Sequence, residues 1–128
     1  MSNQDVLSYC LELLQGNSEI KHIQNRNIVS RAYYFTYYEC VDHIQKRLGW
    51  GETNTKGGVH ARAISRLLDQ TCTDPQKRED ASILYTEINS LKKLRVRADY
   101  RLDLKITRAT AEYCVKEAER IGISLSSL

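Results

Sequence analysis

A long helix is predicted by residues 73–100, which read TDPQKREDASILYTEINSLKKLRVRADY. Asp74 is a candidate N-cap, and Pro75 stands at the first helical position, where its missing N–H costs nothing. Apolar residues then recur at the helical period, which places one set of side chains on a common face: Leu84, Ile88, Leu91, Arg95 and Ala98. Arg95 therefore points where core residues point, on a helix that we expect to end near Tyr100.

The same period recurs on both sides of this stretch. It predicts four more helices, each with an apolar face. A short first helix has the face Val6, Leu7, Cys10, Leu11 and Leu14, and a helix from about 25 to 48 has the face Val29, Tyr33, Thr36, Tyr37, Cys40, Val41, Ile44 and Leu48. A helix from 59 to about 71 has the face Val59, Ala63, Ile64, Leu67 and Leu68, and a last helix from about 107 has the face Ala111, Cys114, Ala118 and Ile121. Gly49 is expected to end the second of these helices, and a glycine-rich polar loop follows it. One proline and six glycines in 128 residues leave few turns for an all-β fold. We predict a single all-α domain over residues 1–128, an antiparallel four-helix bundle with an additional short helix at its start.

Composition places the chain among ordinary soluble domains, with 41% hydrophobic and 27% charged residues. Its four cysteines are far apart in sequence: Cys10, Cys40, Cys72 and Cys114. Because no C-x-x-C pair is present, we expect neither a zinc site nor a thioredoxin-like motif, and free thiols suit the reduced cytoplasm. We also expect no other metal site and no cofactor. The N-terminus lacks a basic segment followed by an apolar core, and no apolar run approaches the ~20 residues of a membrane span, so we expect no membrane association.

Positive charge is concentrated near the end of the 73–100 helix. Between positions 92 and 108 seven basic and two acidic residues give a local charge of +5, although the whole chain carries only +3. The basic residues are Lys92, Lys93, Arg95, Arg97, Arg101, Lys105 and Arg108. Such a cluster is typical of a surface that binds phosphate. The alternative is a solvated helix end whose cations offset the helix dipole.

Short connections between antiparallel helices predict which segments meet. The C-terminal end of the 25–48 helix, the start of the 59–71 helix and the end of the 73–100 helix are expected at one end of the bundle. That end would gather His43, Arg47, the 49–58 loop, His60, Arg95, Arg97, Asp99 and Tyr100. The opposite end would hold Asn25, Arg26, Arg31, Tyr34 and the 72–77 turn.

Three motifs resemble those of the HEPN family of small helical domains, many of them bacterial and linked to toxin–antitoxin or antiviral systems. Ser30-Arg31-Ala32-Tyr33-Tyr34 is similar to the family's S-R-x-Y-Y on an early long helix. Lys56 to His60 match the start of the next helix after a glycine-rich loop, and Leu94-Arg95-Val96-Arg97-Ala98-Asp99-Tyr100 resembles the family's L-R-x-x-A-D-Y. The order and spacing agree over about residues 25 to 121. The resemblance implies a four- or five-helix bundle that commonly forms homodimers, with two arginine motifs beside each other.

The resemblance also implies an activity. Catalytic HEPN members are metal-independent RNases that use an arginine and a histidine with four to six residues between them. At that spacing Arg95 is followed by Tyr100, Arg101 and Leu102, and Arg97 by Leu102, Asp103 and Leu104. The chain is therefore similar to the branch whose arginine motif ends in Asp-Tyr and lacks this histidine. In some related pairs a partner nucleotidyltransferase modifies the tyrosine of the motif, which implies Tyr100 as a candidate acceptor.

Metal-free RNA cleavage needs a base, an acid and a cation for the charge that develops on phosphorus. Arg95 is the candidate cation, because a guanidinium offers two parallel donors to phosphate oxygens. Tyr100 is a candidate hydrogen-bond donor, and His60 is a candidate for proton transfer in place of the missing histidine, within one chain or across a dimer. Two alternatives remain open: His60 packs or caps at its helix start, and Arg95 pairs with a carboxylate such as Asp42 or Asp99.

The remaining candidate residues divide by role. We expect Arg95, Arg97, Arg101, Lys56 and Lys92 to bind RNA or phosphate, and Asp99, Arg31 and Tyr34 to orient or support them. Asp99 is expected to orient Arg97 or to cap the turn. The tyrosines of the 25–48 helix can stack on bases or pack in the core or a dimer interface: Tyr33, Tyr34, Tyr37 and Tyr38.

We therefore expect a cytoplasmic homodimer that binds RNA or a nucleotide within a toxin–antitoxin or antiviral system, with ribonuclease activity left open. The alternative is a non-catalytic helical dimer that binds and regulates a partner, such as a nucleotidyltransferase or another protein encoded in the same operon.

Overall fold

The computed structural model describes residues 2–16, 21–53, 56–69 and 73–128. Within these ranges the chain is all-helical, as predicted, and contains no strand. Five α-helices follow one another: α1 (Asn3–Gln15), α2 (Lys21–Cys40), α3 (Val59–Ser65), α4 (Pro75–Tyr100) and α5 (Arg108–Ser126). A π-helix, Val41–Arg47, continues α2, and a 3₁₀ turn, Arg66–Leu68, continues α3.

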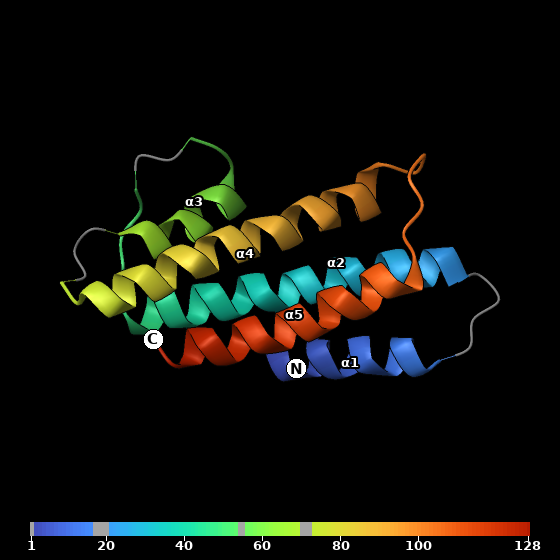
Figure 1. The fold of residues 1–128 in the computed structure, drawn as a ribbon, viewed down its shortest axis with the longest axis horizontal. Helices are drawn as coiled ribbons and strands as arrows, with labels where there is room; N and C mark the ends of the chain where they lie inside the picture. The colour runs from blue at the N-terminus through green and yellow to red at the C-terminus, as the bar shows by residue number, and fades with distance from the viewer. Residues whose placement is uncertain (1, 17–20, 54–55, 70–72) are drawn as a thin grey trace.

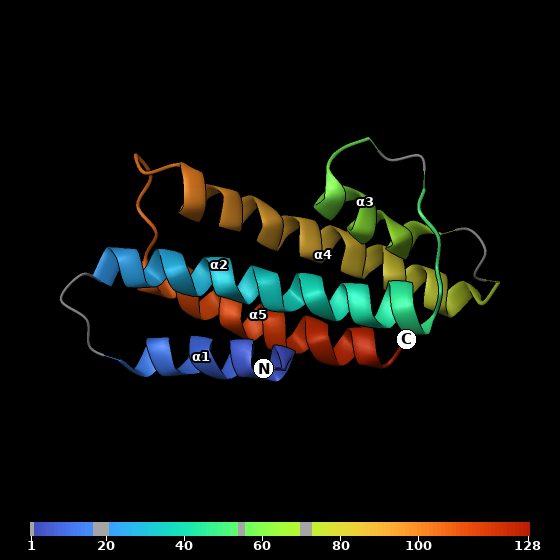
Figure 2. The same ribbon diagram turned by 180° about the vertical axis from the view of Figure 1, so that it is seen from behind.

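The long helices form a bundle around α2. Figure 1 shows α4 antiparallel to α2 and α5 returning alongside both. In the reverse view α2 lies between α1 and α4, with α5 behind it and α3 against the outer side of α4 (Figure 2). No helix within the described ranges is both long and apolar enough to cross a membrane.

The buried residues match the stripes predicted for α4 and α5. In α4 the buried residues are Ala81, Leu84, Ile88, Leu91 and Ala98, and in α5 they include Ala111, Cys114, Ala118 and Ile121. α5 also packs closely on α2, because a Cβ placed on Gly122 would lie only 3.2 Å from the Phe35 ring. The helical period in the sequence therefore identified the core faces of these two helices.

The predicted starts of α4 and α5 are confirmed. Asp74 caps α4 by accepting from the backbone N–H groups of Gln76 at 2.9 Å and Lys77 at 3.3 Å, with Pro75 as the first helical residue. Thr107 caps α5 in the same manner, through the N–H of Thr110.

The stripe predicted for the 25–48 helix is correct as far as Ile44 and fails at Leu48. In the π-helix that follows α2, hydrogen bonds join residues five apart, so each turn contains an extra residue and the exposed face rotates. Ile44 is fully buried, but Leu48, which was predicted to face inward, is 37% exposed. The core position near this end is occupied instead by Trp50, which is 8% exposed.

α3 is shorter than predicted and runs in the same direction as α2, and this direction changes which segments meet (Figure 1). It ends at Ser65, and its 3₁₀ extension ends at Leu68; the predicted end near Thr71 lies outside the described residues. α3 starts beside the middle of α4 and does not cross the whole bundle (Figures 1 and 2). α4 therefore begins near the C-terminal end of α2 and ends near its start. The prediction that the C-terminal ends of α2 and α4 share one end of the bundle is wrong.

Candidate functional site

Arg95 lies on α4 where it faces α2, and its guanidinium is held from several sides. Its Nη2 donates to the hydroxyl oxygen of Tyr34 at 2.6 Å. The guanidinium carbon is 5.1 to 5.6 Å from the ring centroids of Tyr34, Tyr33 and Tyr100, which is cation–π range. Its Nε lies 3.0 Å from Oδ2 of Asp99, an ion pair without hydrogen-bond geometry. The side chain is 12% exposed, so the cation is partly buried but not sealed.

Asp99 is the carboxylate that pairs with Arg95; Asp42 pairs elsewhere. The expectation that Asp99 orients Arg97 is wrong, because its Oδ2 contacts Arg95 one helical turn earlier and accepts from Ser30 Oγ at 3.3 Å. Asp99 thus helps to orient Arg95 and ties the end of α4 to α2.

The contacts of Arg95 with Tyr34, Asp99 and Tyr100 favour its protonated form. Burial lowers the pKa of Arg95, but the hydrogen bond with Tyr34 and the electrostatic effects of Tyr34, Asp99 and Tyr100 outweigh burial, so the net direction is upward. The guanidinium is therefore a permanent cation with a fixed orientation.

His60 lies in the first turn of α3 and packs against the tyrosines of α2. Its Nδ1 is 2.9 Å from the Tyr33 hydroxyl, and its ring stacks on Tyr37 with centroids 4.1 Å apart and 11° between the planes. Burial lowers the pKa of His60, and the positive charges of Arg95 and Lys92 lower it further. The imidazole is therefore neutral near pH 7 and able to accept a proton. Because Tyr33 contacts both His60 and Arg95, the two segments that carry them meet at this tyrosine.

Two residues expected beside Arg95 lie elsewhere. His43 has its Nε2 3.3 Å from Oε2 of Glu39 and also contacts Ser126 near the end of α5. Arg47 pairs with Asp42 at 3.2 Å within the π-helix. Both belong to the end of the bundle where α4 begins, because α3 runs in the same direction as α2 and α4 then runs back along α2.

Residues expected at the opposite end are found at the end of α4. Tyr34 binds Arg95, and Asn25 donates to the carbonyl oxygen of Ile106 at 3.2 Å. Arg26 donates to the carbonyl oxygens at and beyond the α4 C-terminus: those of Arg97, Ala98, Arg101 and Leu104. Two of these carbonyls also accept a backbone N–H, Arg97 from Arg101 and Arg101 from Leu104, and the guanidinium adds a charged donor that offsets the negative end of the helix dipole. Sequence reasoning missed this role, because a basic residue at one helix start does not reveal which helix end lies beside it.

Two exposed cations in the C-terminal half of α4 have no acidic partner within the described ranges. Lys93 and Arg97 lie four residues apart, and neither makes an ion pair there. Residues four apart share a helix face, so these like charges repel one another. Lys92 is half-buried, and its positive charge helps to lower the pKa of His60.

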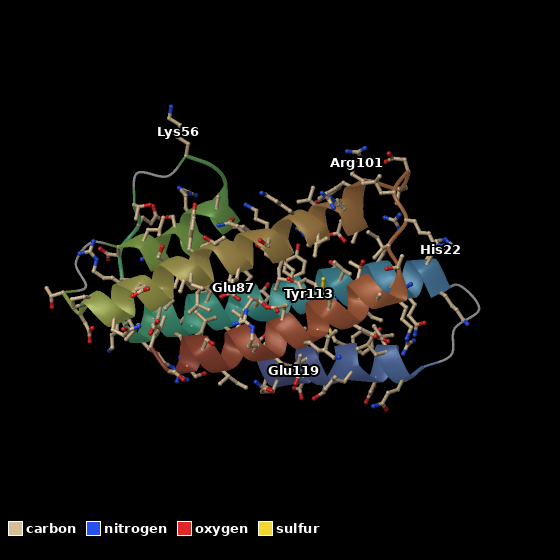
Figure 3. All side chains as sticks on the ribbon, viewed as in Figure 1. His22, Lys56, Glu87, Arg101, Tyr113 and Glu119 are labelled. Carbon is tan, nitrogen blue, oxygen red and sulfur yellow. The ribbon has the colours of Figure 1, made fainter. Side chains whose placement is uncertain are left out.

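The other predicted phosphate ligands are more dispersed. Arg101 forms a two-pronged pair with Asp103, with N···O distances of 3.1 and 3.0 Å. Figure 3 shows Lys56 projecting from the loop before α3 and Arg101 projecting from the end of α4, well apart on the same side of the bundle. Arg31 is exposed on α2 and forms no hydrogen bond or ion pair with the described residues.

The arrangement offers a fixed cation, a neutral imidazole and an exposed phenol at the junction of α2, α3 and α4. Such groups can bind a phosphate oxygen and exchange a proton with it. Within the described ranges no three His, Cys, Asp or Glu side chains gather as metal ligands do. Compared with known proteins, the chain matches no family model, no curated protein and no solved structure.

Proposed function

We propose that this protein is an RNA- or nucleotide-phosphate-binding module of a toxin–antitoxin or antiviral defence system. We further propose that it is a cytoplasmic homodimer with a HEPN-like fold, an antiparallel four-helix bundle with an additional short helix. The motifs that resemble the HEPN family support this proposal. Its binding surface would be the C-terminal half of α4, which we call the α4 basic surface: Lys92, Lys93, Arg95, Arg97 and Tyr100.

The observation that carries the proposal is the unpaired Lys93–Arg97 set. Like charges at this spacing destabilise a helix by a few tenths of a kcal/mol, and neither has a carboxylate beside it in the described structure. An anion bound between them relieves this repulsion. A nucleic-acid backbone supplies such anions at regular intervals.

Arg95 supports the same function by a different route. Its guanidinium is immobilised by Tyr34 and Asp99 before any ligand arrives, so little side-chain entropy is lost when it binds. The exposed ring of Tyr100 lies beside the same cation and can stack on a base.

Binding of labelled single-stranded RNA, measured across a series of salt concentrations, tests the proposal. Each phosphate contact contributes about 0.7 to the slope of log affinity against log salt for a single strand. Lys93→Ala and Arg97→Ala should each weaken binding and flatten this slope by about that amount. Lys77→Ala is the matched control, because it removes an exposed lysine from the opposite end of α4. Absence of RNA binding at low salt, or equal slopes in all variants, contradicts the proposal.

RNA cleavage is a second candidate, favoured by the neutral imidazole of His60 beside Arg95. In such a reaction His60 takes the proton of the ribose 2′-hydroxyl, the 2′-oxygen attacks phosphorus, and the P–O5′ bond breaks as the 5′-oxygen takes a proton from water. Arg95 and Tyr100 stabilise the phosphate oxygens. Wild-type protein should then cut single-stranded RNA in the presence of a chelator, and His60→Gln should not. RNA left intact by well-folded wild-type protein rules out this candidate.

Regulation of a partner protein is the remaining candidate, and the exposure of Tyr100 favours it. This side chain is 68% exposed, so an enzyme can reach its hydroxyl. Incubation with the operon-encoded nucleotidyltransferase and ATP should add one nucleotidyl group to the phenol oxygen and release pyrophosphate. Mass spectrometry should find this addition on Tyr100 and not in Tyr100→Phe.

A further inference from the structure

A groove of about 690 Å³ runs between α1 and α2, two helices that lie side by side in Figure 2. Its volume is in the range of small-molecule sites. Three tyrosines, a cation, a hydroxyl and a carboxylate line it: Tyr9, Tyr34, Tyr38, Arg31, Ser30 and Asp5. The functional argument above used only Tyr34 and Ser30, through their contacts with Arg95 and Asp99.

Two of the tyrosine rings that line the groove are half exposed and are not part of the buried core. Tyr9 is 49% exposed and Tyr38 is 52% exposed, whereas Tyr33 and Tyr37 on the same helix are buried. Tyr38 stacks on Tyr34 with ring centroids 6.3 Å apart and 28° between the planes. A planar ligand placed here would cover ring surface that now contacts water, and each base stacked on an aromatic side chain stabilises a complex appreciably.

The polar groups of the groove match a base that carries a phosphate. Arg31 has no partner among the described residues, and its guanidinium can hold a phosphate through two parallel donors. Asp5 uses Oδ2 to accept from the backbone N–H of Ser2, which caps α1. The same carboxylate can accept from the exocyclic amino group of adenine, cytosine or guanine.

The groove is continuous with the Arg95 site. Tyr34 lines the groove and also accepts the hydrogen bond from Arg95 Nη2. Ser30 lines it as well and donates to Asp99, the ion-pair partner of Arg95. A ligand in the groove would therefore contact residues that also hold Arg95 and Asp99 in place.

We propose that this groove binds a nucleobase, stacked between Tyr9 and Tyr38 with its phosphate on Arg31, next to the phosphate held at Arg95. This inference rests on the proposed phosphate-binding function and adds to it a base-contacting site. The chemistry is shared by a free mononucleotide and by one residue of a single strand, so both are used as probes.

The test compares two probes of equal length and equal phosphate number, a short oligoadenylate and an abasic oligomer. Wild-type protein should bind the oligoadenylate about tenfold more tightly, as expected for one stacked base. Tyr38→Ala and Tyr9→Ala should each remove most of this difference and leave the affinity for the abasic oligomer unchanged. Tyr38→Phe retains the ring and should retain the preference. Tyr113→Ala is the matched control, since Tyr113 is also 49% exposed but projects from α5.

The outcomes separate the two proposals. If wild-type protein binds both oligomers equally, the nucleobase site is overturned and the phosphate-binding function stands. The same conclusion follows if Tyr113→Ala loses the preference for the oligoadenylate as fully as Tyr38→Ala does. Binding of neither oligomer overturns both. Adenosine monophosphate then distinguishes a free nucleotide from one residue of a strand as the ligand. If its binding depends on Tyr38, the groove binds a free nucleotide. If only binding of the oligomer depends on Tyr38, the groove binds one residue of a strand.

Discussion

His60 Nδ1 and the Tyr33 hydroxyl lie 2.9 Å apart and join the start of α3 to the centre of α2. Burial raises the pKa of Tyr33, so its phenol stays protonated at neutral pH. In the Nδ1-protonated tautomer His60 donates to the Tyr33 oxygen and its Nε2 is free to take a proton, whereas in the Nε2-protonated tautomer Nδ1 accepts a hydrogen bond from the Tyr33 hydroxyl and Nε2–H remains a donor. The contact fixes both the position and the ring orientation of the only histidine found beside Arg95 in the described structure.

Stability should fall in mild acid because of His60. Its pKa is lowered in the folded protein, by burial first and then by Arg95 and Lys92, so below the ordinary value of 6.5 the unfolded chain binds the proton more readily. The stabilisation is complete above that value and is lost as the pH falls toward the folded pKa. Urea unfolding between pH about 7.5 and about 5.5 should therefore show a smaller acid loss in His60→Gln than in wild type. His22→Gln, at the exposed start of α2, should lose as much as wild type (Figure 3); identical profiles for His60→Gln and wild type contradict the assignment.

Tyr34→Phe should destabilise the protein by about 1–3 kcal/mol. The substitution keeps the ring but removes the oxygen that accepts from Arg95 Nη2, which leaves a partly buried donor of a charged group unpaired. The midpoint of urea unfolding should fall with an unchanged slope. Tyr38→Phe removes a hydroxyl from an exposed neighbour on the same helix and should change the free energy of unfolding by less than about 0.5 kcal/mol.

Arg26→Ala should destabilise the C-terminal end of α4 by about 2 kcal/mol, because four carbonyl oxygens lose a charged donor. Hydrogen exchange should accelerate most in amides 97–104, near the lost contacts. The exposed Arg31 of the same helix provides the comparison, and Arg31→Ala should leave exchange there unchanged. Uniform acceleration throughout the chain would point to a general loss of packing instead.

Three cysteines should resist alkylation in the native protein. Cys10, Cys40 and Cys114 are buried, and burial raises their pKa values to about 11, about 12 and about 12. Because the thiolate is the reactive form, Cys72→Ser protein should react with a thiol reagent at neutral pH only after urea is added. The substitution is needed because Cys72 lies outside the described residues. Rapid reaction of the native variant contradicts the buried placement.

The long helices could be predicted from the sequence because local signals define them. The cap at Asp74, the proline after it and the apolar period of α4 all depend on residues within a few positions of one another. The inward position of Arg95 followed from the same period. These features need no knowledge of distant contacts.

The remaining features depend on tertiary packing that no local pattern encodes. The direction of α3 decides which helix ends meet, and the prediction assumed that α3 runs antiparallel to α2, whereas it runs parallel to α2. Arg95 and His60 meet nonetheless, because α3 starts beside the middle of α4. The assignments of His43 and Arg26 to the wrong ends both follow from that one assumption. The partner of Asp99 was also mistaken, because Arg95 lies one turn away while Arg97 faces solvent.

The π-helical segment Val41–Arg47 constrains how this chain can tolerate deletions. A π-helix has more residues in each turn than an α-helix. Removing one residue from the segment would therefore let it become regular α-helix without changing the number of turns. Removing one residue from α2 itself would instead turn everything after the cut by about 100° relative to what precedes it. A one-residue deletion within Val41–Arg47 should therefore leave Trp50 in the core. A one-residue deletion within α2 should not.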